Sequence, residues 1–394
     1  MFKKILSKIK PDKKEKADVN KKVGRFLERL SSSVKDANAV IGGSFAKNTW
    51  LKGNHDIDVF VVFENNKKMS ERLEHFIKKS FKKYKKLHGS RDYFIVDFDG
   101  LNFELVPVLK IKKPEEAENI TDISLMHVKF VKEKTNEKLC DEIRLAKYFL
   151  KTNKCYGAET YIGGFSGYLV ELLVIYYKSF QNFIKNAAGW KYSEIIDINK
   201  NNKFISRQKF PLIVIDPVQP GRNAAAALRE EKFNEFIALC QKFSKKPGIN
   251  YFKEKKINLK KYDLVFEVSP LKGNEDVVGT KMLKAFEFIK REFIDNGFAV
   301  KNSSWFWDKN AHLYFKFENK KINKYKEHYG PYVIMLKNAA SFRLKHKNHK
   351  IIIKNKRLVA YIPRRFTKVS DLAKNIIKDK NVRSRVKKIK LKEF

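Results

Sequence analysis

The chain has 394 residues, of which 85 are Lys or Arg and 44 are Asp or Glu, so its formal net charge is +41. At about 100 to 200 residues per domain, this length predicts two or three domains. A hydrophobic fraction of 43% excludes a wholly disordered chain, and the apolar runs are too short for a membrane-spanning helix. We therefore expect a globular protein with no membrane partner.

The three cysteines, Cys140, Cys155 and Cys240, are too few and too scattered for a disulfide framework or a zinc site. The Lys-rich N-terminal segment lacks an apolar stretch long enough for a signal peptide. Both observations favour a reducing, cytoplasmic location.

A positive surplus of this size attracts polyanions, and nucleic acid is the first candidate. Biased composition is a second explanation, because Lys alone supplies 70 of the 85 basic residues. The last 64 residues nevertheless contain 20 Lys or Arg and 3 Asp or Glu, a local net charge of +17. Since bias alone would spread the excess more evenly, this basic tail predicts a polyanion partner without saying which one.

Residues 1–137 are predicted to form a mixed sheet with helices. The Lys-rich start is expected to fray as far as Asp18, which would cap the first helix. β-Branched and aromatic residues predict a buried strand at 57–63, and Asp99-Gly100 is a hairpin turn signal. In chain order, the predicted elements are a helix over 19–36, a strand over 57–63, a helix over 71–87 and strands over 93–98 and 102–111.

Two further domains are predicted, a helical one over residues 138–248 and an α+β body with a basic tail over 249–394, and the fold class is α+β. Helical periodicity and Gly or Pro punctuation set these elements. The predicted helices of the first domain cover 136–153, 164–187 and 223–246. In the second we expect a strand over 262–270, a helix over 281–297, hairpins over 303–318 and 349–363, and a helix over 370–380.

The most informative motif is Gly42-Gly43-Ser44 followed by Asp56 and Asp58. The two carboxylates project from one face of a strand, because side chains alternate with period two. Anions this close need a cation, and Mg²⁺ suits hard oxygen ligands and substrate phosphates. The Gly-Gly-Ser segment offers backbone N–H groups and a hydroxyl for a phosphate. Each element is weak alone, but together they favour a metal and phosphate site over a solvated loop.

Two-metal phosphoryl transfer needs a third carboxylate. Glu104 is the first candidate, because its apolar strand could lie beside Asp58. Asp97 is the alternative, although it could equally be a polar residue near the hairpin turn.

These motifs resemble a known family. The spacing GGS-x(11)-D-I-D with a third strand carboxylate resembles the nucleotidyltransferase superfamily, whose fold is polymerase β-like. The sequence of residues 41–63, IGGSFAKNTWLKGNHDIDVFVVF, resembles that of the archaeal, class I CCA-adding enzymes, which are tRNA nucleotidyltransferases. Residues 142–180 and the segment IDPVQPGRNAAAAL resemble the helical domain of that family.

The resemblance implies a role for each matched residue. Asp56, Asp58 and Glu104 would be the catalytic carboxylates and would hold two Mg²⁺ ions, and Arg222 would read the base of the incoming nucleotide. The residues implied to bind the rest of the nucleotide are Gly43, Ser44, His127, Lys147 and Tyr156.

Without the resemblance, ordinary structural roles would explain most of these side chains. Arg144 and Lys147 would form a solvated basic helix face, and Tyr156 would be a core residue. Arg222 would lie near the start of an Ala-rich helix, where its charge opposes the helix dipole.

The resemblance further implies addition of C, C and A to tRNA 3′ ends from CTP and ATP, without a template, by a cytoplasmic homodimer. A poly(A) or oligoadenylate polymerase and a non-catalytic RNA-binding homologue are the alternatives. Addition of CC alone or A alone also stays open.

Overall fold

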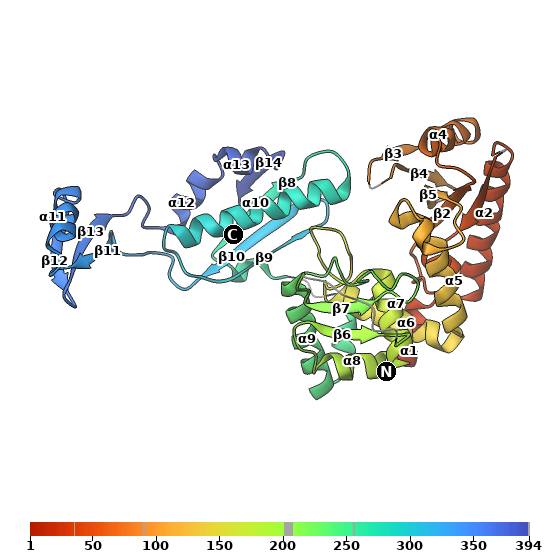
Figure 1. Ribbon diagram of the computed structural model, residues 1–394, viewed down its shortest axis with the longest axis horizontal. Coiled ribbons are helices and arrows are strands. Elements are labelled where there is room, and N and C mark those ends of the chain that lie inside the picture. Colours follow the sequence, from red (N-terminus) through yellow and green to blue (C-terminus); the bar gives the residue numbers. More distant parts are fainter. Residues whose placement is uncertain (35, 90, 201–207, 255–256, 393–394) are drawn as a thin grey trace. The chain divides into compact units, whose positions relative to one another are not determined.

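A computed structural model describes residues 1–34, 36–89, 91–200, 208–254 and 257–392. The chain divides into two units, Met1–Lys255 and Lys256–Phe394 (Figure 1). The predicted border at 137/138 lies inside the first unit, so the division into three domains stays a prediction. Within the described ranges, no helix is both long and apolar enough to span a membrane.

The first unit opens with a five-stranded mixed sheet of order β1-β2-β5-β4-β3. β2 and β5 run parallel, and the other neighbours are antiparallel. Phe26 and Leu30 of α2 and Leu73 of α4 pack on one face of this sheet and bury its core. The elements are α1 (Phe2–Ile9), α2 (Lys13–Ser31), β1 (Ala37–Ile41), α3 (Gly43–Ala46), β2 (Asp56–Phe63), α4 (Met69–Ser80), β3 (Lys85–Leu87), β4 (Tyr93–Phe98) and β5 (Leu101–Leu109).

Two predictions for this region are wrong. The N-terminal segment does not fray, because Ile5 and Ile9 of α1 are buried in the core of the helical part, and α2 is capped by Asp12 rather than Asp18. The helix predicted over 71–87 ends at Ser80, and its last residues form β3. The buried strand and the hairpin at Asp99-Gly100 are confirmed.

The helical part of the first unit follows. Its elements are α5 (Ser124–Lys134), α6 (Glu137–Thr152), α7 (Gly167–Tyr177), α8 (Phe180–Ala187), β6 (Glu194–Asp197), β7 (Leu212–Ile215) and α9 (Glu230–Lys245), with short 3₁₀ helices at Pro114–Glu116, Ile120–Ile123 and Ile249–Phe252. The helix predicted over 164–187 is two helices, because Lys178 takes a left-handed conformation and Ser179 caps α8. The parallel pair of β6 and β7 was not predicted.

The helix predicted over 223–246 begins only at Glu230. Asn223 explains the difference, because its side chain accepts from the backbone N–H of Val214 and Ala225 and donates to the carbonyl of Leu212. These bonds tie the Ala-rich segment to β7 and override its helix propensity. Arg222 therefore does not lie at the start of a helix and does not oppose a helix dipole, contrary to the prediction.

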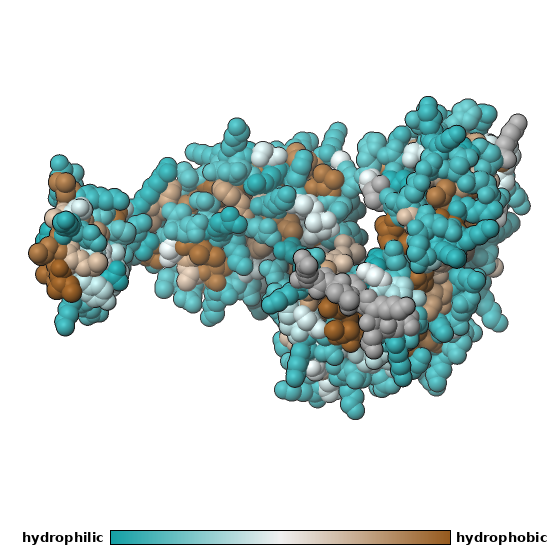
Figure 2. Space-filling view, in the orientation of Figure 1, coloured by the Kyte–Doolittle hydropathy of each residue, from teal (hydrophilic) through white to brown (hydrophobic). Residues whose placement is uncertain are grey.

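The second unit has a four-stranded sheet, β14-β8-β10-β9, and a three-stranded sheet, β11-β13-β12. Both predicted hairpins are confirmed, whereas β11, α11 and β14 were not predicted. Figure 2 shows apolar residues on the α11 module, which consists of residues 325–363 with β11, α11, β12 and β13 and in which Ile334, Leu336 and Leu344 are exposed. The elements are a 3₁₀ helix (Leu259–Lys261), β8 (Leu264–Ser269), α10 (Glu275–Asp295), β9 (Val300–Trp307), β10 (Ala311–Phe317), β11 (Tyr325–Tyr332), α11 (Leu336–Lys345), β12 (Lys350–Lys354), β13 (Arg357–Pro363), α12 (Val369–Ile376), α13 (Lys380–Arg383) and β14 (Lys388–Leu391).

Candidate active site

The three predicted carboxylates lie on neighbouring strands. In the parallel register of β2 and β5, Asp58 stands beside Glu104 and Asp56 beside Asn102. Asp97 pairs with Asn102 from the other side, on β4, so it is one strand farther from β2. Since neighbouring strands are about 4.8 Å apart, Glu104 can share a cation with Asp58 and Asp97 is poorly placed to do so.

These carboxylates repel one another in a half-buried site. Burial raises the pKa of Asp58, the positive charge of Lys47 opposes that rise, and the charge of Asp56 adds to it. Burial, followed by the charges of Asp58 and Asp56, raises the pKa of Glu104 to about 7. A bound divalent cation would relieve this repulsion, and the hard oxygen donors fit Mg²⁺.

The residues that the structure describes contain no group of three or more His, Cys, Asp or Glu side chains already arranged to hold a metal ion. Mg²⁺ commonly binds through one or two carboxylates and completes its coordination with water and substrate phosphates. The pairing of Asp58 with Glu104 therefore fits a metal that the substrate helps to hold.

The Gly-Gly loop lies directly against the carboxylates. The backbone N–H of Gly42 donates to the carbonyl of Asp58 at 2.8 Å. Gly43 has a φ of 56°, and a Cβ there would lie 1.5 Å from Oδ2 of Asp58. At Gly42, a Cβ would lie 2.1 Å from the ring of Phe60. Only glycine lets this backbone approach Asp58 so closely, and Ser44, the second residue of α3, follows directly.

A buried ion cluster joins the sheet to the helical part. Glu171 of α7 is fully buried and accepts from Lys47 Nζ at 2.6 Å, Lys147 Nζ at 2.7 Å and Thr49 Oγ1 at 2.7 Å. Lys147 also donates to Thr49. Lys47, Thr49 and Glu171 were missed, although a lone acid inside the apolar run GYLVELLVIYY was a usable signal.

Tyr156 lies beside this cluster. Burial and then the charge of Glu171 raise its pKa well above the usual range, and a Cβ at Gly167 would lie 2.8 Å from its hydroxyl. Its polar end is thus directed at the ion cluster, although it is also a core residue packed in the helical part.

The solvated basic face expected for Arg144 and Lys147 is wrong, because both side chains are buried. Arg144 donates to the carbonyls of Trp50 and Asn48 and pairs with Asp141. It holds the segment that follows α3 against α6.

Arg222 and His127 converge on Asp216, which directly follows β7. Arg222 Nη1 donates to Asp216 Oδ2 at 2.7 Å, and His127 Nε2 lies 3.0 Å from the same oxygen. The hydroxyl of Tyr168 donates to Oδ1 at 3.0 Å. Two predicted nucleotide ligands, far apart in the sequence, therefore meet at one buried carboxylate.

The mixed sheet with its paired carboxylates and glycine loop defines a nucleotidyltransferase. Residues 23–134 match the family model described as "Nucleotidyltransferase domain". Residues 141–253 match "tRNA nucleotidyltransferase, second domain", and residues 260–390 match "CCA-adding enzyme, C-terminal domain".

Whole-chain relatives narrow the class. A CCA-adding enzyme of Methanocaldococcus jannaschii is 32% identical over 410 residues, covering 96% of this chain and 90% of the relative. A CCA-adding enzyme of Nanoarchaeum equitans is 35% identical over 78% of this chain and 82% of the relative. The chain belongs to the family of CCA-adding enzymes.

Solved structures support the fold. A structure of Cid1, described as an RNA terminal uridylyl transferase, superposes with a TM-score of 0.53, 13% identity, and coverage of 65% of this chain and 97% of that one. A cytoplasmic RNA terminal U-transferase gives a TM-score of 0.52 at 14% identity, covering 65% of this chain and 98% of that one. At these identities the likeness concerns the fold alone.

Proposed function

We propose that this protein adds C, C and A to tRNA 3′ ends from CTP and ATP, without a nucleic-acid template, and releases pyrophosphate. The observation that carries the proposal is the pairing of Asp58 with Glu104 beside the backbone of Gly43, in a member of the CCA-adding family. This arrangement would bring the proposed metal ligands, on the neighbouring inner strands β2 and β5, next to the loop proposed to bind the triphosphate.

Asp56, Asp58 and Glu104 would hold Mg²⁺ in this proposal. When bound, the metal would supply charge neutralisation on the triphosphate and a lower pKa for the attacking 3′-hydroxyl. Gly43 and Ser44 would hold the triphosphate through their backbone N–H groups and the Ser44 hydroxyl.

Lys147 and Tyr156 would complete the triphosphate site, whereas His127, predicted to bind the nucleotide, would act on the base site through its contact with Asp216. Lys47 and Lys147 together carry one positive charge more than Glu171, which partly offsets the negative charge of the neighbouring Asp58 and its partner carboxylates. Arg222 would read the base, because a planar guanidinium offers paired hydrogen bonds that an ammonium cannot.

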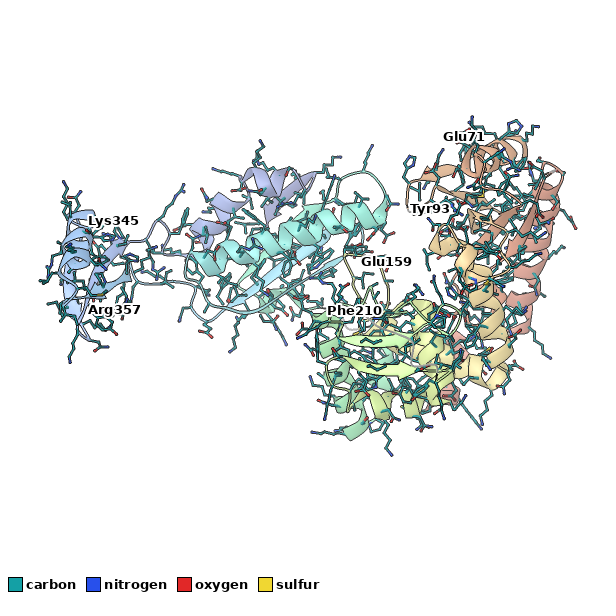
Figure 3. All side chains as sticks on the ribbon, viewed as in Figure 1. Glu71, Tyr93, Glu159, Phe210, Lys345 and Arg357 are labelled. Carbon is teal, nitrogen blue, oxygen red and sulfur yellow. The ribbon has the colours of Figure 1, made fainter. Side chains whose placement is uncertain are left out.

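The basic tail would bind tRNA by contacts to its phosphates, as expected for A-form RNA. Of the two basic residues that Figure 3 labels on the α11 module, Lys345 is exposed, whereas Arg357 donates to the carbonyl of Gly330 and lies over the ring of Tyr332. A cytoplasmic location and a homodimer belong to the same proposal and are tested by cell fractionation and by light scattering.

The test incubates the protein with Mg²⁺ and tRNA that ends at the discriminator base, and supplies labelled CTP and ATP separately and together. We expect CTP to be used first and ATP only after two C residues. Addition of A residues alone would show a poly(A)-type polymerase, and no addition would show a non-catalytic homologue.

Matched variants test the metal ligands. Asp58→Asn and Glu104→Gln should lower the addition rate by at least about 10²-fold, the scale of a lost transition-state contact, with tRNA affinity unchanged. Asp97→Asn should keep the rate. If Asp97→Asn is inactive and Glu104→Gln is active, the third ligand is Asp97.

A further inference from the structure

Asp216 is a fully buried carboxylate whose oxygens are all engaged. Oδ2 accepts from Arg222 and His127, and Oδ1 accepts from the Tyr168 hydroxyl and from the backbone N–H of Val218 at 3.0 Å. A carboxylate with this many donors is held in one orientation and stays ionised. His127 must therefore carry its proton on Nε2, because an ionised carboxylate can only accept.

Arg222 is fixed by its backbone as well as by its side chain. The Asp216 N–H donates to the Arg222 carbonyl at 3.0 Å, and the Arg222 N–H donates to the carbonyl of Gln219 at 2.9 Å. Asn223 then anchors the following backbone to β7. The short segment from Asp216 to Arg222 is thus closed at both ends.

The guanidinium keeps unused donors. Among the described residues, the bond from Nη1 to Asp216 is the only hydrogen bond that the Arg222 side chain makes. A fraction of 33% of this side chain stays exposed. A planar fork with one nitrogen fixed and the others accessible can recognise a partner of defined geometry. A flexible Arg would first lose rotamer freedom on binding.

The other side chains around Asp216 hold it in place rather than compete for the base. The ring of His127 lies on the ring of Tyr168, with centroids 4.2 Å apart and a tilt of 32°. The ammonium of Lys47, already bound to Glu171, is 5.9 Å from the Tyr168 ring. The Asp216 support therefore adjoins the ion cluster near the carboxylates.

We infer that Asp216 is a positioning residue that holds Arg222 in the orientation needed to select the base, with His127 and Tyr168 as its supports. The inference rests on the proposed function, in which Arg222 contacts the incoming base. In an enzyme that has no nucleic-acid template, discrimination between C and A then depends on a carboxylate that does not touch the nucleotide.

The test measures discrimination with Asp216→Asn. We would measure kcat/KM for CTP and for ATP on two substrates, tRNA that ends at the discriminator base and tRNA that ends in CC. Loss of a charged hydrogen bond predicts that the ratio of correct to incorrect addition falls by about tenfold or more, mainly through KM of the correct nucleotide. A merely structural role would slow correct and incorrect addition equally.

Asp122→Asn is the matched control. Asp122 is also fully buried, is paired with Arg91, and accepts from the backbone N–H groups of Leu109 and Asn119. Its substitution should leave discrimination unchanged. If Asp216→Asn does not fold, Tyr168→Phe removes one donor to the same carboxylate and should lower discrimination by about threefold.

A double variant decides whether Asp216 acts through Arg222. Arg222→Ala with Asp216→Asn should discriminate no worse than Arg222→Ala alone. The inference is overturned if the losses of discrimination from Arg222→Ala and Asp216→Asn multiply in the double variant. It is also overturned if Asp216→Asn and Tyr168→Phe leave discrimination unchanged. If the wild-type protein adds no CCA at all, the proposed function fails instead, so the two failures are distinguishable.

Discussion

Replacing Glu171 by Gln should destabilise the first unit, because it leaves two buried lysines without their carboxylate. Lys47 and Lys147 are 9% and 4% exposed, and Glu171 is fully buried between them. The pKa of Glu171 is lowered from 4.5 to about 2, since the charges and hydrogen bonds of Lys147 and Lys47 outweigh burial, the largest single influence, which raises it. A pKa lowered to about 2 corresponds to about 3 kcal/mol of stability at pH 7.

That figure agrees with the loss of about 3 to 5 kcal/mol expected when one partner of a buried ion pair is removed. A lowered carboxylate pKa stabilises the protein above pH 4.5, and this contribution is lost as the pH falls toward 2. At pH 3 less than half of this contribution should remain. The stability gap between wild type and Glu171→Gln should therefore narrow on acidification.

Urea unfolding followed by fluorescence measures this gap at pH 7 and at lower pH. Glu133→Gln is the control, because Glu133 is 58% exposed and lies 4.0 Å from Lys129, and it should change stability by less than about 1 kcal/mol. If Glu171→Gln destabilises the protein no more than the control does, or if the stability gap stays the same at low pH, Glu171 does not stabilise the fold through its ion pairs with Lys47 and Lys147.

Other predictions follow from single contacts. Gly43→Ala should abolish nucleotide addition to tRNA, because the new Cβ would collide with Asp58. Gly53 also has a positive φ, but a Cβ there would meet nothing within 4 Å, so Gly53→Ala should stay active in the same addition assay. Arg144→Met should cost about 3 kcal/mol in urea unfolding, while Arg25→Met, at an exposed ion pair, should cost less than about 1 kcal/mol. Raising salt from about 50 to 200 mM should weaken tRNA affinity by about 10³-fold if six or more phosphates are bound, and filter binding that shows no salt dependence contradicts a phosphate-dominated interface.

Local signals predicted much of the fold. The strand at β2 follows from a run of β-branched and aromatic residues, and the β4–β5 hairpin follows from Asp99-Gly100, so both can be recognised within a few residues. The second predicted hairpin, over 349–363 in the basic tail, was likewise predicted from its local sequence and is formed by β12 and β13. Glu104 was favoured only because its apolar strand could lie beside Asp58, and the register of β2 and β5 places the two residues side by side.

The failures depend on contacts that are distant in sequence. Ala-rich residues after Asn223 favour a helix, yet Asn223 bonds to β7 and delays the helix to Glu230. Arg144 looks solvated until Asn48 and Trp50, more than ninety positions away, surround its guanidinium. Composition and periodicity contain no information on which residues meet across such separations.

The net charge of +41 includes buried cations, which differ from the surface cations because most of them are paired with carboxylates. Glu171 holds Lys47 and Lys147, so this set keeps one positive charge in excess. Arg222 and Asp216 balance each other. Asp58 lies next to the Glu171 set and offsets its excess charge. A triphosphate would therefore need the charge of bound Mg²⁺ as well as that of Lys47 and Lys147, whereas the neutral Arg222 pair has no net charge with which to bind a phosphate. Charge balance thus favours assigning the triphosphate to one buried carboxylate cluster and the base to the other.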